Sequence, residues 1–151
     1  MPKVINLKAG DKGVYINQLP EYITATASSE RDFNGGVINL EVIMSQKGNH
    51  LSLSQGGIKI GPHISKVEVS GQIFYWKSTN TEPYQWASIK LNDKWISTAI
   101  ADNSGDWAGL YFTPRIIDVK EGDVIYFYNM CTGRVRPNEN TYLNVKVAEY
   151  S

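Results

Sequence analysis

The chain has 151 residues with 15 basic and 15 acidic side chains, 11 % aromatic residues and a single cysteine, Cys131. This length suffices for one domain whose core needs no disulfide or metal. The balanced charge argues against nucleic-acid binding, and no apolar run reaches the ~20 residues that membrane insertion requires.

The first 20 residues contain two short apolar runs on either side of a glycine-containing turn, which predicts edge strands or an extended arm. They lack the long apolar stretch of a signal peptide, so we expect no classical secretion. Residues 21–151 are expected to form one head domain. It begins with a strand at 22–27, an exposed polar loop at 28–36 and a strand at 37–44, where β-branched residues favour a strand over a helix.

After a tight meander at 51–60, the segment at 65–76 carries the clearest strand pattern in the chain. Four apolar side chains fall on one of its faces: Val67, Val69, Ile73 and Tyr75. The opposite row is polar until Phe74 and Trp76 enter it, so both faces are apolar at the end of the strand. Antiparallel sheets usually leave one face in water, so this pattern predicts that a neighbouring subunit covers the second face.

Two further strands, 84–91 and 94–96, are predicted to form a hairpin around the turn at Asn92 and Asp93. Beyond them, Pro114 confines its segment to a sheet edge, a bulge or a bend, because proline cannot donate a ladder hydrogen bond.

Residues 124–131 are apolar on both alternating faces, which again predicts cover on both sides. A polar loop at 132–140 and a strand at 142–150 close the chain. About ten short strands separated by turn signals predict an all-β fold, an antiparallel β-sandwich or a barrel.

The order of these elements resembles the jelly-roll head shared by the tumour necrosis factor family and the first complement component. More narrowly, it resembles the complement-head-like domains at the tips of tail or neck fibres in bacteriophages of Gram-positive hosts. The resemblance is carried by five segments, 48–53 (GNHLSL), 56–60 (GGIKI), 65–75 (SKVEVSGQIFY), 119–126 (VKEGDVIY) and 141–145 (TYLNV).

Such a resemblance implies a β-sandwich with jelly-roll topology that assembles as a compact homotrimer, whereas the periodicity alone indicates only an oligomer. The strands beginning near Ser65, Asp123 and Thr141 are then expected to share the sheet at the threefold axis. The side chains expected in the trimer interface are Phe74, Trp76, Tyr126, Phe127, Tyr128, Tyr142 and Tyr150.

The residues give no support to catalysis, because no nucleophile, phosphate-loop or metalloprotease motif is present. His50 and His63 are interpreted as loop histidines, and Cys131 as a buried, unreactive thiol. We therefore expect no cofactor and no metal centre. A weak calcium site at Asp102 and Asp106 stays open as the alternative to a hydrogen-bonded turn.

Three tryptophans near the hairpin could either pack in the core or stack on a sugar. The candidate ligand-binding residues are these tryptophans and the polar groups of the following loop: Trp86, Trp95, Trp107, Asp102, Asn103 and Asp106. Arg134 and Arg136 could pair with an anionic ligand such as a phosphate-bearing wall polymer, or belong to a solvated loop.

The resemblance, together with the lack of catalytic motifs, implies a non-enzymatic bacteriophage virion protein in a tail, baseplate or head fibre. Its expected partners are two further copies of itself, other virion proteins and a host cell-surface glycan bound by avidity. Two alternatives remain open: a purely structural role in capsid decoration or fibre trimerisation, and a cellular lectin-like or signalling ligand.

Overall fold

The structure is a computed structural model of the chain that describes residues 20–76, 84–102 and 107–151. Apart from one short 3-10 turn, η1 (Asn138–Asn140), the regular elements of these residues are all strands. They are β1 (Tyr22–Thr26), β2 (Arg31–Ile38), β3 (Val42–Lys47), β4 (Leu51–Ser54), β5 (Gly57–Ile60), β6 (Ile64–Trp76), β7 (Tyr84–Leu91), β8 (Lys94–Asp102), β9 (Trp107–Asp118), β10 (Val124–Val135) and β11 (Tyr142–Tyr150).

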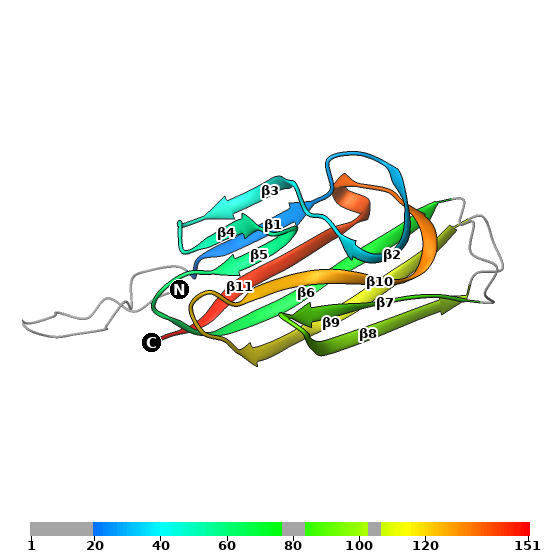
Figure 1. Cartoon of the computed structure of the whole chain (residues 1–151). Coiled ribbons are helices and arrows are strands. Elements are labelled where there is room, and N and C mark those ends of the chain that lie inside the picture. The colour runs from blue at the N-terminus through cyan, green and yellow to red at the C-terminus, as the bar shows by residue number, and fades with distance from the viewer. Residues whose placement is uncertain (1–19, 77–83, 103–106) are drawn as a thin grey trace, which may run out of the picture.

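The strands are antiparallel and form two layers (Figure 1). The first layer has the order β3-β1-β11-β6-β9. In the second layer β10 is central, with β7 and then β8 on one side and with β2, β5 and β4 on the other. Among the described residues the layers are linked by one backbone pair, Val135 with Tyr75.

The core lies between the layers and is built from the inward row of each strand. On β6 the predicted set, Val67, Val69, Ile73 and Tyr75, is buried, which confirms the strand and its inward face. From the second layer the ring of Phe127 reaches across to Phe112 of β9, with centroids 5.5 Å apart.

Gly71 shows how closely the two layers pack. A Cβ added at this position would collide with the carbonyl oxygen of Tyr142 on the paired strand β11 and would lie 3.0 Å from Cζ of Phe127 in the opposite layer, so glycine is needed for both neighbours.

The segment expected as an exposed loop at 28–36 is largely a strand, and that prediction was wrong. Residues 31–38 form β2 and pair with β10, with a register shift between Asn129 and Thr132. The predicted strand at 37–44 is correspondingly interrupted, because β2 ends at Ile38 and β3 begins only at Val42. Pairing with a strand about 90 positions later in the chain overrides the local turn signals.

The loop predicted at 132–140 is also shorter than expected, since residues 132–135 extend β10 against β2. The hairpin prediction is confirmed, with Leu91 paired to Lys94 across the turn. Pro114 lies within β9, which pairs with β6 alone among the described strands and has a register shift beside it. Both features agree with the edge or bulge predicted for this proline.

Candidate functional site

The outer surface of the first layer carries a cluster of aromatic side chains, which we call the aromatic face: Phe74, Trp76, Trp107, Tyr111 and Tyr142. Trp76 is directly opposite Trp107, and Gln72 is directly opposite both Tyr111 and Tyr142, so these side chains share one side of the sheet. The Trp107 ring centroid lies 5.9 Å from that of Phe74 and 6.0 Å from that of Trp76.

Two members of the aromatic face are strongly exposed, Trp107 at 59 % and Tyr111 at 68 %. The Tyr111 ring lies over Gly109, which stands opposite Phe74, so the aromatic surface continues between the strands. Large rings gathered on one side of a sheet are costly to leave in water. This surface is therefore the strongest candidate in the described residues for contact with a partner.

Polar contacts hold the backbone under the aromatic face. Thr141 Oγ1 accepts a hydrogen bond of 2.9 Å from the Phe74 amide, and Gln72 Nε2 donates to the carbonyl of Asn140 at 3.0 Å. The guanidinium of Arg136 lies 5.2 Å from the Trp76 ring centroid, a cation–π distance. The rings are thus displayed on a fixed surface.

The expectation that β10 shares the axis-facing surface with β6 and β11 was wrong, because β10 lies in the other layer. β10 pairs with strands of the second layer, and only its last residue, Val135, pairs with β6 as well. Phe127 is fully buried in the core and cannot contact another subunit. Tyr126 and Tyr128 are half-buried on the outer side of the second layer. Tyr150 packs against the core at the end of β11.

The expected ligand-binding residues do not come together. Trp86 and Trp95 lie on the second layer, whereas Trp107 belongs to the aromatic face and Arg136 stacks beside it. Nη1 of Arg134 lies 4.0 Å from Oε1 of Glu30, where the end of β10 pairs with the start of β2.

The calcium prediction and part of the ligand prediction concern a loop that is only partly described. Asp102 is the exposed last residue of β8, while Asn103 and Asp106 lie outside the described residues. Within the described ranges no three His, Cys, Asp or Glu side chains gather as a metal site, and no helix there is long and apolar enough to cross a membrane.

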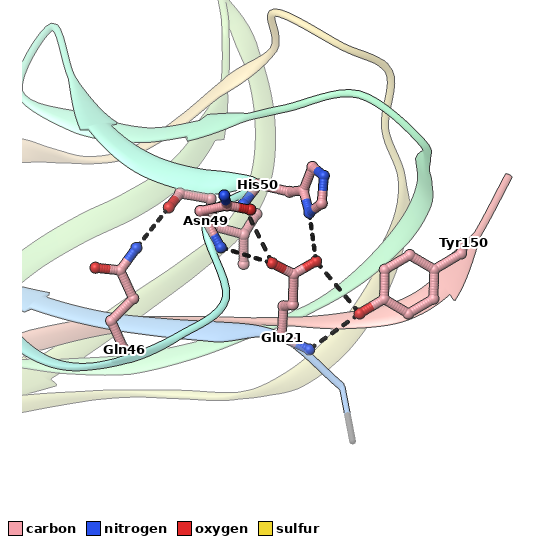
Figure 2. Close-up of polar contacts among 6 residues, drawn as sticks. Glu21, Gln46, Asn49, His50 and Tyr150 are labelled. Carbon is pink, nitrogen blue, oxygen red and sulfur yellow. Dashed lines mark hydrogen bonds and ion pairs between the residues drawn. The ribbon is translucent and has the colours of Figure 1, made fainter. Parts of the chain in front are cut away.

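A buried carboxylate that the sequence did not single out lies at the start of β1. Glu21 accepts hydrogen bonds from the amides of Asn49 (2.8 Å) and His50 (3.2 Å), and its Oε2 lies 2.7 Å from His50 Nδ1 (Figure 2). Tyr150 completes the cluster, since its hydroxyl accepts from the Glu21 amide at 3.1 Å. Glu21 thereby connects the turn between β3 and β4 to the start of β1 and to the end of β11.

Two sequence features belong to this cluster. Gly48 has a φ of +80°, and a Cβ there would collide with the Glu21 carboxylate, so the turn needs glycine. His50 is a turn histidine that contacts a carboxylate of its own chain. In the sequence, only the glycine-containing turn at Gly48 hinted at this cluster. Glu21 lies 27 positions before Gly48, and its contact with the turn depends on the pairing of β1 with β3, which the sequence did not reveal.

Burial would raise the pKa of Glu21, but the hydrogen bonds from His50 and Asn49 outweigh it and hold this pKa below its usual value. A carboxylate with a lowered folded-state pKa stabilises the fold above the pKa of the unfolded chain, about 4.3 for glutamate. That contribution is lost as the pH falls through the lower, folded-state pKa.

We expect Glu21→Gln to reduce the free energy of unfolding by about 2 kcal/mol at neutral pH, because an amide cannot accept all of these hydrogen bonds. The difference between the variant and the parent protein should shrink as the pH falls below about 4, because the carboxyl of the parent protonates first in the unfolded chain and then, at lower pH, in the folded protein. Urea unfolding at neutral pH and again below about pH 4 measures this difference in the free energy of unfolding. Glu121→Gln, at an exposed glutamate, is the matched control. A pH-independent difference would contradict the role given to the ionised carboxylate.

The arrangement of the strands is that of the tumour necrosis factor family: the described residues adopt its jelly-roll fold. Among solved structures, murine APRIL at pH 5.0 aligns with a TM-score of 0.64 and 10 % identity, over 85 % of this chain and 99 % of that one. Eiger TNF from S. frugiperda aligns with the same score and identity, over 88 % of this chain and 94 % of that one.

This likeness confirms the fold predicted from the sequence resemblance, and at 10 % identity it concerns the fold alone. No protein-family model matches the sequence, and no curated protein matches it either.

Proposed function

We propose that the protein is a homotrimeric head domain that acts by binding rather than by catalysis. The aromatic face carries this proposal, because it places five rings on the outer side of the β6, β9 and β11 layer. The resemblance to tumour necrosis factor and complement-type heads supplies the number three, since such heads are compact trimers that use this sheet at their axis.

The energetics favour burial of the aromatic face between copies. Removing apolar surface from water contributes roughly 25 cal/mol per Å², and obligate interfaces bury more than about 2,000 Å² in total. Trp107 and Tyr111 are exposed enough in one protomer to contribute most of their ring area on assembly. A trimer also suits a binding role, because each further weak contact profits from the effective concentration set by the first.

For the ligand, we propose a host cell-surface saccharide, with the trimer at the tip of a bacteriophage fibre or baseplate. This finer proposal rests on the sequence resemblance to phage fibre heads. A cellular ligand is the second candidate, and it is favoured by the likeness to murine APRIL and Eiger TNF.

Light scattering of the purified chain tests the assembly: the expected mass is three times the 16.9 kDa of one protomer. A mass of one protomer at micromolar concentration would contradict the proposal.

Incubating a labelled trimer with Gram-positive bacteria and, separately, with animal cells distinguishes the phage candidate from the cellular ligand. Binding to bacteria that soluble wall polysaccharide competes away supports the phage candidate, and binding to animal cells alone supports the cellular ligand.

A further inference from the structure

We propose that the β7–β8 turn bears a binding site for a neutral saccharide, with Trp95 as the stacking ring. This inference deepens the binding role proposed above and rests on it. The site lies within one protomer, on the layer opposite the aromatic face, and does not use Trp107 or Arg136.

Trp95 is held in place although it is 50 % exposed. The edge of its ring meets Tyr128, with centroids 5.9 Å apart and an interplanar angle of 81°. Lys90 Nζ lies 4.6 Å from the Trp95 ring centroid and 4.5 Å from that of Tyr128, so one ammonium group bridges both rings. A ring fixed before binding loses little conformational freedom when a ligand stacks on it.

The turn beneath Trp95 is equally well held. Asn92, with a φ of +52°, donates from Nδ2 to Asp123 at 3.0 Å, and its Oδ1 accepts from the Val124 amide at 3.0 Å. Its own amide donates to the Val124 carbonyl at 2.8 Å. These bonds fasten the hairpin turn to the start of β10, so Asp93, Lys94 and Trp95 sit on a rigid support.

A hollow of about 830 Å³ opens beside the turn, with Trp95, Asp93, Lys94 and Lys120 among the residues that line it. The hollow is wide and open to solvent, so it can receive one face of a ligand rather than enclose it. Asp123 also lines it, but both of its carboxylate oxygens already accept hydrogen bonds, from Asn92 and from the Lys120 amide. The remaining polar groups can therefore turn toward a ligand.

The charges of the hollow decide the class of ligand. Among the lining residues, two acidic side chains, Asp93 and Asp123, are matched by two basic ones, Lys94 and Lys120, so the lining has no excess charge. Lys90 lies outside this lining and its ammonium is already held against the rings of Trp95 and Tyr128. It offers both hydrogen-bond donors and acceptors around an aromatic ring. A sugar presents the matching surface, hydroxyls that both donate and accept and an apolar ring face that stacks on indole.

Trp86 supplies a matched control on the same layer. It lies four residues before Lys90 on β7, about 13 Å away at the rise of an extended strand, and it is paired with Ile100 rather than with the turn. It does not line the hollow. Replacing it should leave sugar binding intact.

Ligand-observed NMR with a panel of glucose, galactose, rhamnose and N-acetylglucosamine tests the proposal. We expect at least one of these sugars to bind, with affinity weakened roughly tenfold in Trp95→Ala and unchanged in Trp86→Ala. Asp93→Ala, in the exposed turn, should also weaken binding and guards against a folding defect in the tryptophan variant. No binding of any sugar, or binding undiminished in both turn variants, would overturn the proposal.

Light scattering on the same samples separates this inference from the trimer proposal. Trp95→Ala should keep the mass of the parent protein. A lower mass would place Trp95 in a subunit contact and overturn the saccharide site, whereas a monomeric parent that still binds sugar through Trp95 would contradict only the trimer.

Discussion

Trp107→Glu is expected to convert the proposed trimer into folded monomers. Trp107 is 59 % exposed in one protomer and lies about 6 Å from both Phe74 and Trp76, so a carboxylate there leaves the protomer core intact. In a trimer the same carboxylate would be buried among aromatic rings without a partner, once in each subunit. An unpaired buried charge costs several kcal/mol, so assembly should fail at micromolar concentration.

Trp95→Glu is the matched control for this experiment, since Trp95 is also about half exposed but lies on the other layer. Light scattering should give the parent mass for Trp95→Glu and one third of it for Trp107→Glu. Circular dichroism should report the same strand content for both. A Trp107→Glu protein that keeps the parent mass would show that the aromatic face is not the subunit interface.

Local alternation was sufficient to predict the strand that organises the first layer. The period-2 pattern at 65–76 placed four side chains in the core and Phe74 and Trp76 outside it. Alternation is sufficient here because successive side chains of a strand point to opposite faces of the sheet. The hairpin at Asn92 and Asp93 was equally local, since its two strands are adjacent in sequence.

Pairing between distant segments could not be predicted in the same way. The pattern at 124–131 showed apolar side chains on both faces but not which strands lie beside them. The structure pairs β10 with β2, β5 and β7, which makes Phe127 a core residue and moves Tyr126 and Tyr128 to the second layer. The glycines and polar residues of 31–38 predicted a loop, because this segment forms a strand only through its backbone pairing with β10.

The candidate sites divide for the same reason. The three tryptophans Trp86, Trp95 and Trp107 are near one another in sequence but lie on opposite layers, because β7 and β8 belong to the second layer and β9 to the first. Trp107 therefore belongs with Phe74 and Trp76, while Trp95 belongs with Lys90 and Tyr128. The fold thus places the proposed assembly surface and the proposed saccharide site on opposite layers.

Phe127→Ala should lower the free energy of unfolding by about 3–5 kcal/mol, the usual cost of removing a fully buried phenylalanine. Its ring fills the space over Gly71 and packs against Phe112, so truncation leaves a cavity between the two layers. Tyr128→Ala is the control from the next position on β10, where the side chain is half-buried on the outer side, and it should cost clearly less.

Urea unfolding measures both losses of stability, and light scattering under native conditions measures the assembly. If Phe127 acts only in the core, Phe127→Ala should be less stable than the parent protein but keep its mass, the reverse of the result expected for Trp107→Glu. Dissociation of folded Phe127→Ala into monomers with unchanged protomer stability would instead return this side chain to the subunit interface. The two variants together therefore distinguish the packing of the layers within one protomer from the packing of protomers against one another.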